Sequence, residues 1–251
     1  NALLSLCSQM HKRPGLLAGH PWFFQYWTRD EAISAKGLFL AEKKKLAKEI
    51  LLNALMHIDS DGRIPNRIPE ADIGCADGVG WTFFRLKELF EDNAFSPKEI
   101  TIVQERLSLS LERIEQKLMD DGLVQNARLE TWMDTDWSGD DRAGKRIEIQ
   151  TLTLEMYRFL FLLTGSQNAQ KKASELKKKI REVFWNDVYL KDGSDDDTVR
   201  PNLFFSYYTS PDLLTKKEWE SCFDIALKRL WLDWGGLSTI DKNNPLYCNR
   251  H

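Results

Sequence analysis

The sequence predicts an all-α fold built of two layers of helices. Apolar residues recur at helical spacing through most of the 251 residues, and no segment shows the clear alternation typical of strands. The helices also differ in kind: 150–164 is apolar around most of its circumference, whereas 44–58 and 168–185 carry charge on one side. Buried and solvated helices that alternate along the chain indicate an inner layer enclosed by an outer one.

The individual elements follow from periodicity and from start signals. The longer helices are expected at 30–41, 44–58, 78–91, 97–118, 150–164, 168–185 and 215–230, with shorter ones near 1–10 and 202–209. Two starts carry a capping box, in which a Ser or Thr and the Glu three residues later bind each other's backbone N–H groups. These pairs are Ser96 with Glu99 and Thr215 with Glu218. The expected total is about nine helices.

Composition excludes several classes of partner. With 42% hydrophobic and 29% charged residues and a net charge of -3, the chain has no basic footprint for nucleic acid. The lysine runs at 43–45 and 177–179 belong to solvated helix faces, and no apolar run of about 18 residues is present to span a membrane. The four cysteines have no CxxC spacing, so we expect no metal, no cofactor and reduced thiols in the cytoplasm.

Tryptophan is the unusual residue type, with nine in 251 positions. An indole has a flat apolar face and a polar N–H, which suits half-wet surfaces such as the faces of sugars. Three long loops, at 61–78, 120–146 and 186–202, combine tryptophan with Asp, Asn and Arg. Long irregular loops in compact domains are usually functional or disordered, and this composition favours function.

The stretch "ETWMDTDWSGDD" has the highest density of candidate catalytic groups. Its carboxylates and indoles are Glu130, Asp134, Asp136, Asp140 and Asp141, with Trp132 and Trp137 between them. A carboxyl beside an indole can have its pKa raised by desolvation and act as a general acid. The alternative is a set of turn-forming aspartates that cap the next helix.

Two further carboxylates, Asp30 and Glu148, each allow both a functional and a structural interpretation. In "FFQYWTRDEAI", Arg29 and Asp30 are adjacent residues of an expected helix, so they point about 100° apart and form a poor pair. Either each has its own structural partner, or both reach toward a ligand. Glu148 stands between Ile147 and Ile149, and faces either a cavity or the positive end of a helix.

Other loop residues are compatible with the same site. Asp77 is placed to cap a helix, Trp81 follows one turn later, and Asn66 lies in an extended loop after a proline. The run "DGSDDD" at 192–197 lacks the spacing of a calcium loop. Carboxylates, indoles, Arg and Asn on the loops of a helical double layer suit a neutral, hydroxyl-rich ligand, and carbohydrate is the natural candidate.

At this point the sequence resembles the amylo-α-1,6-glucosidase domain of glycogen debranching enzymes. Seven segments match motifs of that family in the same order along the whole chain: "AGHPWFFQYWTRDEAISAKGLFL", "DGRIPNRI", "CADGVGWTF", "ETWMD", "GKRIEIQTL", "DDTVRPNLF" and "GGLSTI". The resemblance implies an (α/α)6 toroid of six helical hairpins related to glucoamylase, and cytoplasmic, inverting hydrolysis of α-1,6-linked glucose at branch points of glycogen or a related glucan.

The resemblance also implies roles for matching residues. Asp134 of "TWMD" corresponds to the general acid, and Arg29 and Asp30 of "WTRD" correspond to residues that hold the hydroxyls of the terminal glucose. The other residues implied to bind substrate are Trp27, Asn66, Asp77, Trp81, Trp132 and Glu148. Inverting hydrolysis needs a second carboxylate about 6.5–9.5 Å from the acid to activate water.

The sequence departs from the family pattern in three places. Thr28 replaces the more usual Gly in "WTRD", Leu203 stands where Gln is common, and the family motif with the catalytic base is expected only after His251. With Asn1 as a start without Met, we expect 1–251 to be one catalytic domain truncated at its C-terminal side. It would contain about nine of the twelve helices of a complete toroid, and would pack against further segments of the same parent chain.

Two alternatives remain at this stage. One is a glucoamylase-like or other six-hairpin glycosidase that acts on a different linkage or sugar. The other is a carbohydrate-binding remnant of the same fold without catalytic activity.

Overall fold

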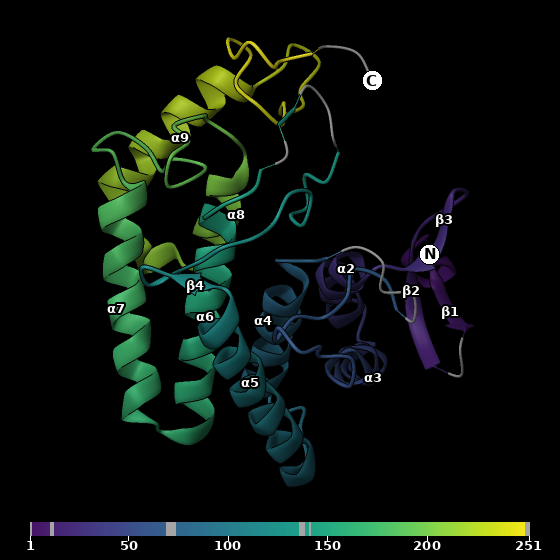
Figure 1. Ribbon diagram of the computed structural model, residues 1–251. Coiled ribbons are helices and arrows are strands. Elements are labelled where there is room, and N and C mark those ends of the chain that lie inside the picture. The colour runs from purple at the N-terminus through teal and green to yellow at the C-terminus, as the bar shows by residue number, and fades with distance from the viewer. Residues whose placement is uncertain (1, 11–12, 69–73, 136–138, 141, 249–251) are drawn as a thin grey trace.

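The helices form two layers, as expected from their two kinds of sequence. The computed structural model describes residues 2–10, 13–68, 74–135, 139–140 and 142–248. The longer helices among them are α2 (Thr28–Leu40), α3 (Lys44–Leu55), α4 (Gly78–Glu91), α5 (Pro97–Lys117), α6 (Ile147–Thr164), α7 (Gln167–Phe184), α8 (Asn202–Thr209) and α9 (Lys216–Leu230). Figure 1 shows their arrangement, with α6 and α7 side by side as a long antiparallel hairpin.

The inner layer consists of α2, α4, α6 and α8. Each of these helices packs on the next one of the layer, and the chain returns through α3, α5, α7 and α9 on the outside. Every residue from Ile147 to Tyr157 of α6 is buried, whereas α7 buries a single stripe from Ala169 to Phe184. Since each outer helix returns the chain, the four inner helices start at the same end of the molecule.

The starts predicted from capping boxes are confirmed. Ser96 accepts a hydrogen bond from the backbone N–H of Glu99 and the Glu99 side chain accepts from that of Ser96, and Thr215 and Glu218 do the same at α9. Aromatic rings then join α9 to α8: the rings of Phe204 and Phe223 stack with centroids 5.5 Å apart.

The expectation of a purely α-helical chain is wrong, because short strands are present. An antiparallel sheet in the order β1-β2-β3 is formed by β1 (Cys7–Met10), β2 (Arg13–Gly19) and β3 (Phe23–Tyr26). A two-stranded ribbon, β4 (Met119–Asp120) and β5 (Leu123–Val124), follows α5. The helix expected near 1–10 shrinks to α1 (Ala2–Ser5), and β1 takes the rest.

Contacts between distant residues explain the N-terminal sheet. The phenol oxygen of Tyr26 accepts a hydrogen bond from the backbone N–H of Met10 at 2.9 Å and donates one to the carbonyl of Ser8 at 3.0 Å. Arg13 forms a buried ion pair with Glu31 of α2, with Nη2 2.9 Å from Oε2. The sheet thus covers the end of α2, and no local periodicity would reveal it. In the described part of the chain, none of the helices combines the length and apolar character needed to cross a membrane.

Candidate active site

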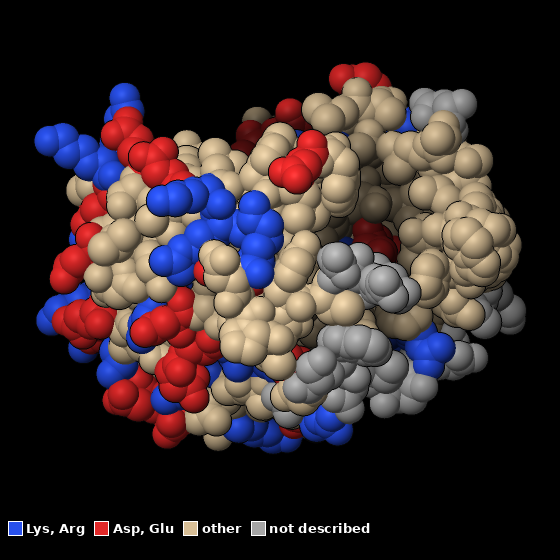
Figure 2. Space-filling view, turned by 90° about the horizontal axis from the view of Figure 1, so that it is seen from above, with Lys and Arg blue, Asp and Glu red and all other residues tan. Residues whose placement is uncertain are grey.

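A hollow of about 470 Å³ opens where the inner helices begin. Its size lies within the usual range of ligand pockets. Its walls are formed by Ala18, Phe23, Trp27, Arg29, Asp30, Ile33, Ser34, Trp81, Trp132, Asp134 and Phe205. Figure 2 shows a hollow with acidic side chains (red) at its floor and mainly uncharged side chains (tan) around it.

The structure brings most of the sequence-predicted site residues together. Those that line the hollow are Trp27, Arg29, Asp30, Trp81, Trp132 and Asp134. They come from the start of α2, the first turn of α4 and the loop before α6. Asn66, Asp77 and Glu148 are buried outside its lining.

Arg29 has a structural partner of its own. Its Nε donates to both carboxylate oxygens of Asp77, at 2.9 and 2.7 Å, while its Nη1 lies 3.6 Å from Oδ2 of Asp134. Its Nη2 donates to the carbonyl of Glu130 at 3.4 Å. Asp77 stands at the N-cap position of α4, yet its carboxylate makes no capping bond, because Arg29 occupies it. The Arg29 guanidinium therefore contacts a buried carboxylate, Asp77, and a partly exposed one, Asp134.

The surroundings of Arg29 are desolvated. Cys75 lies within hydrogen-bond distance of Asp77, its thiol donating to Oδ1 at 3.4 Å. Burial, and then the Asp77 charge, raise the pKa of Cys75 to about 12, so the thiol stays protonated. Burial also raises the pKa of Asp30, which the positive charge of Arg29 counteracts in part. The Asp30 side chain lines the hollow together with Arg29.

Asp134 is a partly exposed carboxyl in the lining of the hollow. Its side chain is 37% exposed, whereas that of Asp77 is 1% exposed. The indole of Trp132 and the ring of Phe205 meet edge to face beside it, with centroids 5.6 Å apart. Of the other acids in this stretch, Glu130 pairs with Arg63 at 2.6 Å and Asp140 pairs with Arg200, so the segment is not a simple helix cap. Asp136, Trp137 and Asp141 lie outside the described residues.

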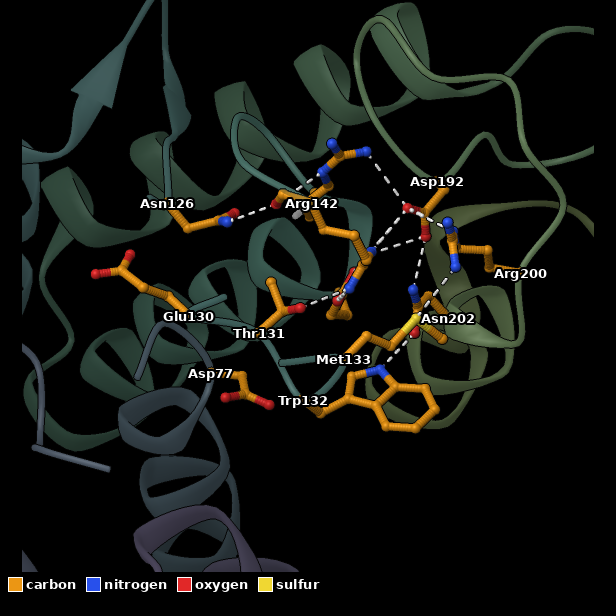
Figure 3. Close-up of polar contacts among 12 residues, drawn as sticks. Asp77, Asn126, Glu130, Thr131, Trp132, Met133, Arg142, Asp192, Arg200 and Asn202 are labelled. Carbon is orange, nitrogen blue, oxygen red and sulfur yellow. Dashed lines mark hydrogen bonds and ion pairs between the residues drawn. The ribbon is translucent and has the colours of Figure 1, made fainter. Parts of the chain in front are cut away.

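Glu148 belongs to a buried ion cluster instead of the hollow. Arg142 binds both of its oxygens, Nη1 to Oε1 at 2.8 Å and Nη2 to Oε2 at 3.2 Å. Burial raises the pKa of Glu148 and the Arg142 charge lowers it. The cluster continues from Arg142 to Asp192, which contacts Arg200 and Asn202 (Figure 3).

Asn66 supports the start of α2 through its backbone. Its carbonyl accepts a hydrogen bond from the N–H of Thr28 at 2.9 Å, and the Thr28 hydroxyl donates to the carbonyl of Pro65 at 2.5 Å. The buried Oδ1 of Asn66 and Nε1 of Trp27 find no hydrogen-bond partner among the described residues. The Trp27 side chain lines the hollow, although its indole nitrogen is itself buried.

The sequence did not predict several residues that complete or support the site. Phe205 of α8 and Phe23 of β3 line the hollow, and Asp192 with Asn202 supports it from behind. The signal for Phe205 was its place just after "RPN", next to a matched motif; nothing local marks Asp192 among the acids of its loop. No group of three His, Cys, Asp or Glu side chains within the described ranges is arranged to hold a metal ion.

Fold and site together define a class: a helical toroid that presents carboxylates and aromatic rings at one end of its inner helices. A crystal structure of a GH63 mannosylglycerate hydrolase from Thermus thermophilus shares the fold with a TM-score of 0.72 at 12% identity, over 97% of this chain and 79% of that one. An uncharacterized conserved protein from the same organism shares it with a TM-score of 0.71 at 13% identity, over 97% and 78%.

The family follows from the sequence itself. A profile of the family described as Amylo-alpha-1,6-glucosidase matches residues 2–251, and the chain belongs to this family of glycoside hydrolases. The resemblance noted from the motifs is thereby confirmed over the whole chain. No curated protein matches the sequence.

Proposed function

We propose that the protein is a glycosidase that removes α-1,6-linked glucose at branch points of a glucan with inversion. The observation that carries the proposal is the placement of Asp134 at 3.6 Å from Arg29 in a hollow walled by aromatic rings. A terminal sugar has apolar faces and a rim of hydroxyls, and this site offers indoles for the former and charged groups for the latter.

Four of the residues that line the hollow have a part in the proposed mechanism. Asp134 donates a proton to the glycosidic oxygen as the C1–O bond breaks, and the leaving chain departs as an alcohol. A water molecule bonds to C1 from the opposite face and gives its proton to a second carboxylate, the general base that inversion requires. Arg29 and Asp30 bind hydroxyls of the terminal glucose, Arg29 as a donor and Asp30 as an acceptor. Trp27 lines the hollow and offers its aromatic ring to a face of the sugar. Together these contacts would fix the anomeric carbon beside Asp134.

The departure from the usual family motif at Thr28 leaves this assignment in place. The Thr28 side chain is buried and donates to the carbonyl of Pro65, so it does not face the hollow. A threonine there stabilises the junction between the loop and α2 rather than altering the surface that a sugar meets.

A second candidate is hydrolysis of another linkage or another sugar in the same hollow. It is favoured by the shared fold with a mannosylglycerate hydrolase from Thermus thermophilus. Fold alone does not set linkage, because specificity depends on the side chains around the reacting bond.

Asp134→Asn in the full-length protein tests the acid. We expect kcat for glucose release from a branched limit dextrin to fall by about 10²–10⁴-fold, the usual contribution of a general acid, with substrate binding retained. The matched control is Asp195→Asn, at an exposed aspartate away from the hollow, which should keep full activity. An active Asp134→Asn enzyme would contradict the proposed role. Faster release from linear maltooligosaccharides than from limit dextrin would favour the second candidate.

A further inference from the structure

We propose that Asp192 is a positioning residue, which sets the geometry of the acid by anchoring the loop that carries Asp134. The inference rests on the proposed role of Asp134 as general acid. Asp192 itself is fully buried, with none of its side chain exposed, and lies behind the hollow.

The side chains of the residues just before Asp134 are held by polar contacts with other parts of the chain. Each of the three residues that precede Asp134 has a polar partner for its side chain (Figure 3): Arg142 donates to Thr131 Oγ1 at 2.8 Å, Trp132 donates to Asn202 Oδ1 at 2.6 Å, and Arg200 donates to Met133 Sδ at 3.6 Å. The partners come from two different loops and from the start of α8. Three consecutive anchors leave the carboxyl of Asp134 little freedom relative to the hollow.

All three partners converge on one carboxylate. Asn202 donates to Oδ1 of Asp192 at 2.6 Å, Arg142 contacts Oδ1 through Nη2 at 2.9 Å, and Arg200 places Nε 3.5 Å from Oδ2. Arg146 adds a fourth contact to Oδ2, at 3.4 Å. Asp192 is thus the common counter-charge of three buried arginines and the orienting acceptor for Asn202.

Glu148 has a narrower part in the same cluster. It pairs with Arg142 but makes no contact with Asn202 or Arg200 among the described residues. Removing the charge of Asp192 would take away the one carboxylate that all three arginines share. Each would keep only its separate acidic partner, Glu148 for Arg142, Asp196 for Arg146 and Asp140 for Arg200, so their present arrangement around Asn202 would be lost. The anchors at Thr131, Trp132 and Met133 would move with them.

The two charged groups proposed to hold the sugar, Arg29 and Asp30, are supported mainly from another side. The contacts of Arg29 with the loop, 3.6 Å to Asp134 and 3.4 Å to the carbonyl of Glu130, are longer than its bonds to Asp77. Arg29 is oriented by Asp77, and Asp30 lies in the first turn of α2, on elements that make no contact with Asp192 in the described structure. Loss of Asp192 should therefore disturb the acid more than sugar binding. A misplacement of about 1 Å in a catalytic group can cost about 10²-fold in rate.

The test compares two substrates in Asp192→Asn enzyme. An oxygen-linked branched substrate needs a proton on its leaving group, whereas α-glucosyl fluoride needs little acid assistance because fluoride leaves readily. We expect kcat on the branched substrate to fall about 10²-fold, with KM changed less than about 3-fold and the rate on the fluoride nearly unchanged. Asp196→Asn is the matched control: Asp196 pairs with Arg146 at 2.8 Å in the same cluster but reaches none of the three anchors.

A second variant and a second measurement keep the proposal testable if Asp192→Asn folds poorly. Thr131→Val removes one anchor without removing a charge, and should show the same selective loss at about 3–10-fold. Amide hydrogen exchange of 130–135 should accelerate in both variants, while that of 28–40 stays unchanged.

The outcomes separate this proposal from the proposed function. Equal losses on both substrates, or unchanged exchange at 130–135, would overturn the positioning role. A wild-type protein that hydrolyses neither glycoside nor fluoride would refute the proposed function. Faster exchange at 130–135 in that case would still show that Asp192 holds the loop.

Discussion

At the scale of single residues, the ion pair with Asp77 orients Arg29 in the site. These residues stand 48 positions apart in the sequence, yet Arg29 Nε contacts both oxygens of one buried carboxylate. Helix geometry predicted that Arg29 and Asp30 point apart. In the structure, Arg29 is bound by the buried Asp77, and Asp30 lines the hollow.

Asp77→Asn should weaken both stability and sugar binding. The variant leaves the Arg29 guanidinium buried without its counter-charge, which costs up to about 3–5 kcal/mol in other proteins. KM for the glycoside should rise by more than about 10-fold, since Arg29 loses its orientation. Chemical unfolding and steady-state kinetics measure the two effects.

The control for this variant is a surface pair of the same kind. Lys44 and Asp92 form an ion pair with both side chains more than 40% exposed, so Asp92→Asn should change little. Similar losses in Asp77→Asn and Asp92→Asn would show that burial is not the cause.

Residue types predicted part of the site, and packing supplied the rest. Trp27, Arg29 and Asp30 are adjacent in sequence, so a single helix start delivers them together. The indoles and carboxylates of the later loops were identifiable as candidates because such groups in long loops are rarely idle. Asp192 was not identifiable, because its value comes from four partners whose positions only the fold determines.

At the scale of elements, helices were predicted well and strands were not. A capping box depends on residues three apart, as with Ser96 and Glu99, so the sequence shows it directly. Strand β1 depends on pairing with β2, in which Cys7 faces Leu16. Four-residue strands of this kind have no periodic signal strong enough to compete with helical patterns nearby.

Close approach of two inner helices gives a prediction at this scale. A Cβ added to Gly80 of α4 would stand 2.6 Å from the Cβ of Leu152 in α6. Gly80→Ala should therefore destabilise the protein by about 1–3 kcal/mol through overpacking, despite the better helix propensity of alanine. Thermal and chemical unfolding provide the measurement.

Gly37→Ala provides the comparison within another inner helix. The Cβ at Gly37 of α2 would meet only the flexible end of Leu3, at 2.9 Å. This variant should be neutral or stabilised by up to about 1 kcal/mol, since alanine favours the helix. If both glycine variants behave alike, contact between α4 and α6 is not the limiting factor.

At the scale of the whole molecule, ion pairs tie successive hairpins together. Asp212, in the short turn Pro211–Leu213 between α8 and α9, contacts Arg158 of α6 at 2.7 Å and Lys177 of α7 at 2.6 Å. Three hairpin elements therefore meet at one carboxylate. Burial raises the pKa of Asp212, but the hydrogen bonds from Arg158 and Lys177 outweigh it and lower the pKa to about 2.

The depressed pKa predicts how this link depends on pH. Because the folded pKa lies below the ordinary value of 3.8, the stabilisation is present above that value and is lost as the pH falls toward about 2. At pH 7, Asp212→Asn should lower the free energy of unfolding by an amount on the order of 1 kcal/mol, as for an exposed ion pair, and the melting temperature should fall accordingly. The difference from wild type should vanish near pH 2.

Melting curves between pH 7 and pH 2 check this expectation. Asp224→Asn is a suitable control, since Asp224 is exposed on α9 and should behave like wild type at every pH. A difference for Asp212→Asn that persists below the folded pKa would show that it arises from packing rather than charge.

The sequence by itself determined the helices, their two kinds and the family, because these depend on short-range periodicity, local caps and ordered motifs. It also delivered the side chains of the hollow that stand in those motifs, including Arg29 and Asp134. Only the tertiary structure decided the strands, the place of Glu148 in an ion cluster and the convergence on Asp192. Burial and charge pairing depend on which distant segments meet, and no window of sequence contains that information.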